Sequence, residues 1–336
     1  MIDQGLASKA VTLDGATLDV VVAAVRAAGH SCARRADGTA ACWAWLSNER
    51  NQNGELGSGV IGGSVQLGEA SVVLSAAGTP LDGVLRLGGE GSACQVSATL
   101  CAIATGGGLY CWGDNPNGAF FAGSADRPWA TPMLADAETA LSGVDEVAVG
   151  FDHICARRGG EVACWGISFS GQIGTGSLGS EDYPVVVSAL PAGVSQLIAG
   201  ARYSCALAAG DVYCWGAIDL VGNGADDDAD PGCGGCVRTP VRVLTATGPL
   251  TGVARLVGAS RSACAITTAG TVYCWGDRSP AAPAGVAALA TPVALPTGTT
   301  DHMLCQSGTS ASTLNYVNPD GSYHVANAEL PVVCEP

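Results

Sequence analysis

One short pattern recurs along this chain and constrains its fold more than any other feature. In each copy a Cys-Ala pair is followed, nine or ten residues after the cysteine, by a second cysteine and a tryptophan, and four of the five copies continue with glycine. The copies are residues 32–43, 101–113, 155–166, 205–216 and 264–276. Successive second cysteines are 50 to 69 residues apart. The chain is therefore a repeat protein with insertions between its units.

Each copy reads as a β-hairpin. An apolar strand enters, a short turn such as Asp37-Gly38, Gly159-Gly160 or Ala269-Gly270 reverses the chain, and a strand rich in Val and Tyr returns. The two cysteines can occupy facing positions, where Cα atoms about 4.5 Å apart are close enough for a disulfide. The spacing predicts five hairpin disulfides, namely Cys32–Cys42, Cys101–Cys111, Cys155–Cys164, Cys205–Cys214 and Cys264–Cys274.

Two further strands accompany the hairpins. A short apolar strand ending in Gly precedes the hairpin at residues 144–150, 194–200 and 253–258, and a Pro-Val strand follows at 184–187 and 240–243. Four short strands that recur about every 50 residues are typical of a propeller blade. Because a single blade cannot bury both of its faces, the blades must close into a ring. We expect an all-β propeller of about six four-stranded blades.

The repeats predict one β-propeller domain over residues 1–336. The units are 20–75, 76–134, 135–187, 188–243, 244–294 and 295–336. The last unit is degenerate, since it begins at Met303-Leu304-Cys305 and has no Trp-Gly. A seventh blade stays open as an alternative, built by the N-terminal 30 residues together with the C-terminal tail.

The unit resembles the repeat of the regulator of chromosome condensation family. Besides Cys-Trp-Gly, the segments Gly54-Glu-Leu-Gly57 and Gly171-Gln-Ile-Gly174 match the Gly-Gln-Leu-Gly element of that repeat. The likeness runs from about residue 20 to 300 and is greatest to the secreted bacterial branch, which has a cysteine before Trp-Gly. It implies a β-propeller, for which seven blades are usual in the family. It also implies a precedent for protein binding, because one secreted bacterial relative inhibits β-lactamases through an aromatic-rich face.

Composition narrows the classes of partner. Forty-eight glycines suit many tight turns, and the formal net charge is −15, with Lys9 as the one lysine. Phosphate neutralisation supplies most non-specific affinity for nucleic acids, so we expect no nucleic-acid partner. No stretch approaches the ~20 apolar residues that a membrane-spanning helix needs, so we expect no membrane span.

Fifteen cysteines in a pattern unlike a metal site indicate an oxidising compartment. The first 29 residues contain no basic start followed by an apolar core, so no signal peptide is recognisable. We therefore expect a secreted protein, extracellular or periplasmic or at the cell surface, whose export signal is absent from this sequence. A cytosolic protein with reduced cysteines is the alternative.

Five cysteines lie outside the five hairpins, namely Cys94, Cys233, Cys236, Cys305 and Cys334. Cys233-Gly-Gly-Cys236 has no second pair for zinc, and the acidic residues before it would raise a thiol pKa, so we predict a loop-closing disulfide, Cys233–Cys236, in preference to a redox centre. Cys305 is expected to pair with Cys334. Because fifteen is odd, Cys94 is then unpaired or linked to another molecule.

No motif points to catalysis or to a cofactor. A run of carboxylates, Asp226, Asp227, Asp228 and Asp230, is a weak candidate for structural calcium, but it lacks the EF-hand spacing and we favour a solvated insertion. His30 and His153 occupy the same repeat position as Tyr203, two residues before a hairpin cysteine, which indicates a structural role. We expect no cofactor, no metal and no enzymatic activity.

The predicted function is binding of a protein partner through loops on one face. The repeat places the loops after each Trp-Gly equivalently, and these loops carry aromatic residues of the kind enriched at hot spots. The candidates are Trp45, Phe120, Phe121, Trp129, Phe169 and Tyr183. Alternatives are a lectin-like module for carbohydrate at the cell surface, a subunit of an extracellular assembly or filament, and an enzyme with its site in the propeller shaft.

Overall fold

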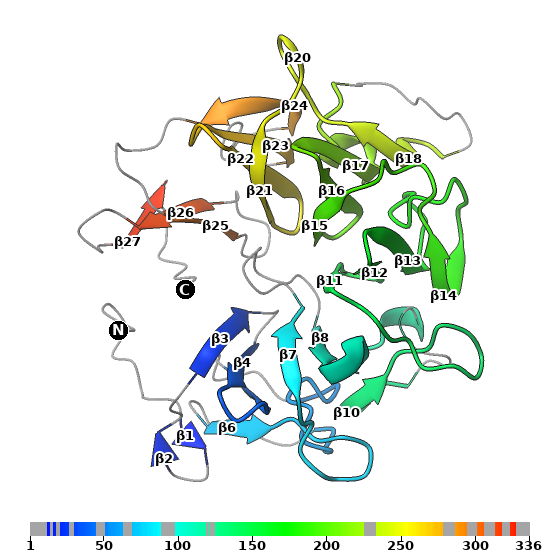
Figure 1. The fold of residues 1–336 in the computed structure, drawn as a ribbon, viewed down its shortest axis with the longest axis vertical. Coiled ribbons are helices and arrows are strands. Elements are labelled where there is room, and N and C mark those ends of the chain that lie inside the picture. The colour runs from blue at the N-terminus through cyan, green and yellow to red at the C-terminus, as the bar shows by residue number, and fades with distance from the viewer. Residues whose placement is uncertain are drawn as a thin grey trace.

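The computed structural model describes residues 12–13, 16–17, 21–26, 30–44, 51–62, 69–88, 98–118, 120, 125–224, 233–277, 286–293, 301–305, 313–317 and 323–326. In these parts the chain forms β-strands and three short 3-10 helices, η1 (Thr105–Gly107), η2 (Pro116–Gly118) and η3 (Ile218–Leu220). Six sheets are arranged as blades around a common centre (Figure 1). The predicted all-β propeller of about six blades is confirmed.

The blades follow one another in chain order. Blade 1 contains β3 (Val21–Arg26), β4 (His30–Arg35), β5 (Ala40–Ala44) and β6 (Glu69–Val72), with β1 (Thr12–Leu13) and β2 (Ala16–Thr17) added beyond β6. Blade 2 contains β7 (Val84–Leu87), β8 (Thr99–Ala104), β9 (Gly108–Gly113) and β10 (Arg127–Pro132). Blade 3 contains β11 (Glu146–Val149), β12 (His153–Arg158), β13 (Glu161–Ile167) and β14 (Ser180–Val186).

Blades 4 and 5 repeat this plan, and blade 6 has three strands within the described residues. Blade 4 contains β15 (Val194–Ala199), β16 (Tyr203–Ala208), β17 (Asp211–Ala217) and β18 (Cys236–Arg242). Blade 5 contains β21 (Val253–Gly258), β22 (Ser262–Thr267), β23 (Val272–Asp277) and β24 (Val286–Val293). Blade 6 contains β25 (Asp301–Cys305), β26 (Thr313–Val317) and β27 (Tyr323–Ala326), and β19 (Leu244–Thr245) with β20 (Gly248–Pro249) forms a small hairpin between blades 4 and 5.

Within blades 2 to 5 the strands are consecutive and antiparallel, and the chain runs from the centre to the rim. The first strands β7, β11, β15 and β21 lie around the centre, and the fourth strands β10, β14, β18 and β24 lie at the rim (Figure 1). In blade 1, β1 pairs with the fourth strand β6 in parallel. Blades 2 to 5 therefore present the same ends of their strands to the same face of the ring.

The two cysteines of each hairpin face each other in register between the second and third strands. All five predicted hairpin disulfides are present, with Cα–Cα distances of 4.0 to 4.1 Å. The cysteines of these pairs are fully buried. Each disulfide therefore cross-links the two middle strands of a blade. By closing a loop of about ten residues, it adds up to ~3 kcal/mol to the free energy of unfolding.

The tryptophan of the repeat packs against the preceding blade. Trp112 Nε1 donates to the carbonyl oxygen of Glu55 at 3.1 Å, and Trp215 Nε1 donates to that of Gln172 at 2.8 Å. A Cβ at Gly174 would lie 2.6 Å from Trp215 Nε1, so only glycine leaves room for the indole. The Gly-x-x-Gly loop of one blade and the Cys-Trp-Gly hairpin of the next therefore form one packing unit.

Proline protects the rim strands. Each of β10, β14, β18 and β24 contains at least one proline, among them Pro184 in β14 and Pro240 in β18. A strand with proline at its free edge pairs poorly with another strand, because proline donates no backbone hydrogen bond. The rim of these four blades is thus unsuited to the addition of a strand from another chain.

Candidate partner-binding face

The two ends of the blades differ in the connections they carry. The connections from first to second strand and from third to fourth strand leave one end, which we call the loop face, and the turns from second to third strand leave the other, which we call the turn face. On the loop face the third-to-fourth connections that are described at least in part are residues 45–68, 114–126, 168–179 and 218–235. On the turn face the corresponding turns are 36–39, 105–107, 159–160, 209–210 and 268–271. The third-to-fourth connections are therefore longer and more variable than the second-to-third turns.

The predicted aromatic candidates divide into four groups. Phe169, in the connection 168–179, is 72% exposed. Trp129 in β10 and Tyr183 in β14 are half-buried on rim strands. Trp45 and Phe121 lie outside the described residues. Phe120 is only 1% exposed. Its selection as a contact residue was wrong.

Phe120 is buried because it occupies the apolar position of the Gly-x-Leu-Gly element. Its backbone N–H donates to Asn115 Oδ1 at 2.9 Å, as the N–H of Leu56 donates to Asn51 Oδ1 at 3.0 Å. It packs in the core between blades 2 and 3, which includes Trp165. An alignment of Gly118-Ala-Phe120 with Gly54-Glu-Leu56 would have assigned it to the core.

At the loop end of blade 3 the structure adds two exposed apolar residues that sequence reasoning missed. Phe151, between β11 and β12, is 51% exposed, and Leu178, at the far end of the connection that carries Phe169, is 37% exposed. Phe151 lies outside the loops that follow Trp-Gly, and Leu178 is not aromatic, so aromatic residues in those loops point to neither of them. Phe151 directly follows the glycine that ends the first strand, and that position is the signal that could have found it. We call Phe151, Phe169 and Leu178 the blade 3 apolar surface.

Hydrogen bonds hold the bases of these two connections together. The N–H of Ile167 donates to the carbonyl of Asp152 at 2.8 Å, and the N–H of Ser168 donates to that of Gly179 at 2.6 Å. Gln172 Nε2 donates to Asp152 Oδ1 at 3.1 Å. The backbone that presents the blade 3 apolar surface is therefore fixed by bonds within blade 3.

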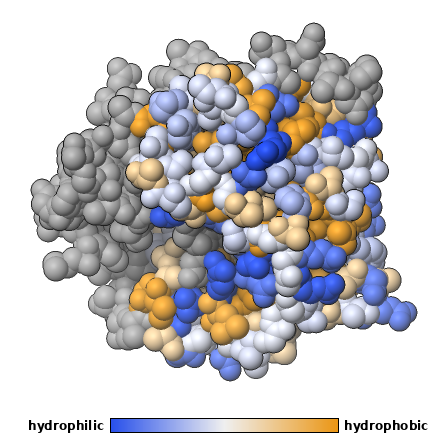
Figure 2. Space-filling model, turned by 45° about the horizontal axis from the view of Figure 1, so that its top comes forward, coloured by the Kyte–Doolittle hydropathy of each residue, from blue (hydrophilic) through white to orange (hydrophobic). Residues whose placement is uncertain are grey.

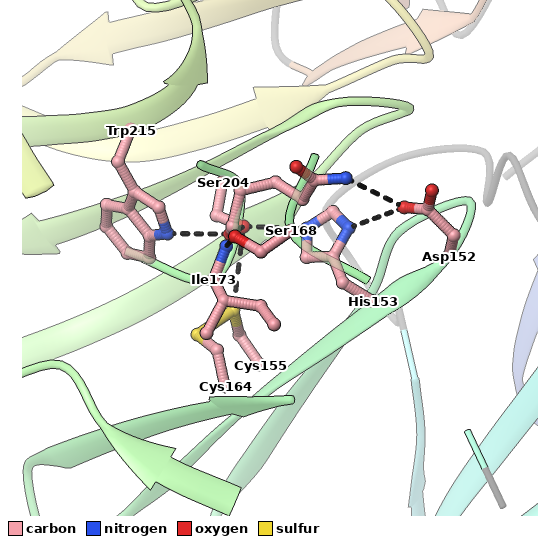
Figure 3. Close-up of a disulfide and its surroundings, with 9 residues drawn as sticks. Asp152, His153, Cys155, Cys164, Ser168, Ile173, Ser204 and Trp215 are labelled. Carbon is pink, nitrogen blue, oxygen red and sulfur yellow. Dashed lines mark hydrogen bonds and ion pairs between the residues drawn. A yellow bond between two sulfur atoms is a disulfide. The ribbon is translucent and has the colours of Figure 1, made fainter. Parts of the chain in front are cut away.

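A buried polar network then fixes the same connection to blade 4 (Figure 3). The Gln172 carbonyl accepts hydrogen bonds from Trp215 Nε1 at 2.8 Å and from Ser204 Oγ at 3.0 Å. His153 Nε2 lies 2.8 Å from Ser204 Oγ. Because Ser204 donates to Gln172, His153 in its neutral form donates from Nε2 to the serine oxygen. The element Gly171-Gln-Ile-Gly174 thus joins two blades.

The same network contains the residue types of a Ser-His-Asp triad in an arrangement closed to substrate. Asp152 Oδ1 is 3.6 Å from His153 Nδ1, a separation longer than a hydrogen bond. His153 is fully buried and Ser204 is 1% exposed, beneath the Cys155–Cys164 disulfide. A nucleophilic serine needs a substrate carbonyl within reach of Oγ, and here protein atoms surround that oxygen. The network serves to position the loop.

Comparison with known proteins defines the fold. No family model matches the chain. Yeast RCC1 (Prp20), in its structure with Kap60, has a TM-score of 0.61 at 20% identity over 86% of this chain and 64% of that chain. Human WBSCR16 has a TM-score of 0.65 at 17% identity over 91% and 75%, and Prp20p from Saccharomyces cerevisiae has 0.55 at 17% over 88% and 82%. The fold is that of an RCC1-like propeller. The chain spans less than two thirds of the first of these structures.

The resemblance drawn from Cys-Trp-Gly and Gly-Gln-Leu-Gly is thus confirmed as a likeness of fold. In this RCC1-like propeller both elements lie where two blades meet, so they hold neighbouring blades together. The other residues of the loops are not needed for that contact and can differ between such proteins. The residues that distinguish one such protein from another are therefore expected on the loop face.

The loop face of this RCC1-like propeller is acidic where blades 1 and 2 meet. Burial raises the pKa of Glu55, and the nearby carboxylates of Asp114 and Asp126 raise it further. Burial also raises the pKa of Asp114, with the nearby carboxylate of Asp126 as the next cause.

Where blades 4 and 5 meet, Arg261 forms ion pairs with Asp277 at 2.6 Å and with Asp219 at 3.4 Å. The positive charge of Arg261 is therefore balanced by carboxylates on the same face.

The remaining candidate sites meet the described residues only in part. Cys233 and Cys236 form the predicted loop-closing disulfide at the end of the connection 218–235. Cys94, Cys334 and the calcium candidates Asp226, Asp227, Asp228 and Asp230 lie outside the described residues, so Cys305–Cys334 and the calcium site stay predictions. In the part of the chain that is described, no group of three His, Cys, Asp or Glu side chains could hold a metal ion. There, too, no helix is both long and apolar enough to cross a membrane.

Proposed function

We propose that this chain is a secreted, non-enzymatic propeller scaffold that binds a protein partner through its loop face. The observation that carries the proposal is the blade 3 apolar surface. Its most exposed side chain, Phe169, is 72% exposed on a connection fixed to two blades. A large exposed apolar group on a preorganised loop is typical of an interface anchor, because little conformational entropy is lost on binding.

The structural relatives support protein binding as a use of this fold. Yeast RCC1 (Prp20) has been crystallised with Kap60, and Prp20p from Saccharomyces cerevisiae has been studied for binding to Gsp1p and histones. Those partners belong to those proteins. What carries over to this chain is that an RCC1-like ring is rigid enough to present loops to another protein.

The disulfides support secretion. Five buried hairpin disulfides and the Cys233–Cys236 pair are structural bonds, and such bonds rarely persist where thioredoxin and glutathione keep thiols reduced. Multiple disulfides indicate a non-cytosolic protein. The absence of an exposed nucleophile–base pair at Ser204 and His153 is consistent with a binding role.

Capture experiments with matched variants test the proposal. The full chain is immobilised and exposed to the culture medium of its source, and retained proteins are identified. The double variant Phe151→Ala/Phe169→Ala should lose the partner. Val186→Ala should keep it, because Val186 is 43% exposed at the opposite end of β14.

Three outcomes would contradict the proposal. Retention of every captured protein by the double variant would remove the blade 3 apolar surface as the site. Binding to a glycan array without a protein partner would favour the lectin-like module. Filaments of the pure protein in negative-stain micrographs would favour the structural subunit.

A further inference from the structure

We propose that the blade 3 apolar surface binds a basic protein surface, in which an apolar pocket is bordered by lysine or arginine side chains. This inference rests on the proposed function and adds the chemistry of the partner. It follows from how charge is distributed between the two ends of blade 3.

The apolar part is preorganised. Beyond the bonds that close its base, the connection 168–179 contains successive turns in which Gly171 N–H donates to the Ser168 carbonyl at 3.2 Å and Gly174 N–H donates to the Gly171 carbonyl at 2.9 Å. Ser170 N–H donates to Gln172 Oε1 at 2.8 Å. Phe169 therefore projects from a backbone whose conformation is already set on both sides. An anchor of this kind fits a pocket in the partner.

Carboxylates border the apolar part, and cations are absent from this end of the blade. Asp152 precedes β12, and Glu181 and Asp182 begin β14, where Glu181 pairs in register with Gly166 at the loop end of β13. From residue 146 to 186, all of which is described, the arginines are Arg157 and Arg158, and lysine is absent. Both arginines adjoin the turn 159–160 on the turn face, and Arg157 there forms ion pairs with Glu146 at 3.2 Å and with Asp145 at 3.4 Å. The loop end of blade 3 is therefore negative.

The neighbouring blades do not reverse this charge. On the blade 2 side Asp114 and Asp126 lie near Arg127, the first residue of β10. On the blade 4 side Arg202 pairs with Asp219 at 3.6 Å, and Asp219 also pairs with Arg261 at 3.4 Å. Arg238 of β18, whose carbonyl accepts the N–H of Gly176 at 3.0 Å, places one cation beside the connection 168–179, against the three carboxylates of Asp152, Glu181 and Asp182. The whole chain carries a formal net charge of −15. An acidic partner would be repelled from this surface, whereas a basic one is steered toward it and gains pairs with the bordering carboxylates.

The geometry favours recognition by side chains over strand addition. Pro184 interrupts the free edge of β14, the rim strand beside this surface, so a partner cannot extend the sheet there. In Figure 2 the apolar residues of the face drawn form separate patches between polar residues. An interface at the blade 3 apolar surface combines the apolar anchor Phe169 with a border of carboxylates, as interfaces with an apolar centre and a polar rim do.

Selection from a random 16-residue peptide library on phage, with the full chain as bait, tests the inference. We expect the selected peptides to be enriched in Lys or Arg next to an apolar side chain. Chemically synthesised copies should bind Phe151→Ala/Phe169→Ala at least about tenfold more weakly than the natural chain. Glu181→Gln/Asp182→Asn should weaken binding and flatten its dependence on salt.

The matched control for charge is Glu138→Gln/Glu161→Gln. It also removes two carboxylates, both of them exposed, but Glu161 lies at the turn face and Glu138 in the link from β10 to β11. This variant should keep both the affinity and the salt dependence. Each variant is checked by circular dichroism and thermal unfolding, so that loss of fold is separated from loss of binding.

Other results would overturn the inference in distinguishable ways. Selected peptides that are neutral or acidic, but still need Phe151 and Phe169, would contradict the basic partner and leave the proposed function standing. Equal loss of binding in the charge control would show a general effect of net charge. Peptides that bind without the two phenylalanines, or a failure to select any peptide, would contradict both proposals.

Discussion

At the scale of single residues, the contact between Gly174 and Trp215 decides how two blades meet. Gly174 has φ of +80°, and a Cβ there would lie 2.6 Å from Trp215 Nε1. The repeat pattern identified both residues as recurring. Recurrence alone could not show that they touch across the blade boundary, because that contact joins units about 40 residues apart in sequence.

Gly174→Ala should therefore destabilise the ring. A new methyl group against a fixed indole adds overpacking of about 1–3 kcal/mol to the cost of a positive φ. Gly159→Ala is the control, since Gly159 has φ of +58° but nothing within 4 Å of the added Cβ. Urea unfolding followed by tryptophan fluorescence should give a clearly larger loss for Gly174→Ala. Equal losses would mean that backbone strain alone fixes glycine at this position.

Asp114 gives a second prediction at this scale, about pH. Burial raises its pKa above the ordinary 3.8, so the folded chain holds this proton more tightly than the unfolded chain does. The free energy of unfolding that depends on Asp114 is then highest below pH 3.8 and falls as the pH rises through the raised value. Asp114→Asn should raise the melting temperature at pH 7 and have little effect at pH 3.

Asp136→Asn should behave in the opposite way. Hydrogen bonds from the backbone N–H groups of Glu138 and Thr139 lower the pKa of Asp136, so its contribution is present above pH 3.8 and is lost as the pH falls. The variant should therefore lower the melting temperature at pH 7. Melting curves in which both variants shift in the same direction at pH 7 would refute the assignment of these two environments.

At the scale of elements, the hairpins were predictable and the loops were not. A hairpin depends on local signals, such as Gly159-Gly160 at its turn and two cysteines at facing positions, and the sequence contains all of them. The exposure of Phe169 and the burial of Phe120 depend on how each connection packs on the next blade. Both residues follow a Trp-Gly element, so that position does not separate them, whereas the alignment of Gly118-Ala-Phe120 with Gly54-Glu-Leu56 does.

The disulfides provide a prediction at the element scale. The cysteines of the five hairpin pairs are fully buried, whereas Cys233 is half-buried in the loop that it closes with Cys236. Exchange needs access of a thiolate to a sulfur atom. Titration of the native chain with dithiothreitol, followed by alkylation and peptide mapping, should open Cys233–Cys236 before any hairpin pair. Simultaneous opening of Cys205–Cys214 would contradict this order.

At the scale of the whole molecule, the repeat separates the scaffold from the binding residues. Cores such as the one formed by Ile173, Leu197 and Trp215 lie between neighbouring blades. Because each blade needs a neighbour on both faces to bury its apolar residues, the recurrence of the unit already indicated a closed ring. The choice of face could also be inferred, since antiparallel strands send alternate connections to opposite ends. The aromatic residues that follow Trp-Gly supplied only Phe169 of the blade 3 apolar surface, because Phe151 lies outside those loops and Leu178 is not aromatic.

The central claim is that a protein partner binds at the loop face. Hydrogen–deuterium exchange of the full chain, alone and with a saturating captured partner, tests it most directly. Slower exchange should appear in residues 150–152 and 168–179, with the turns 159–160 and 209–210 unchanged. Protection confined to those turns, or to the rim strand β14, would contradict the account.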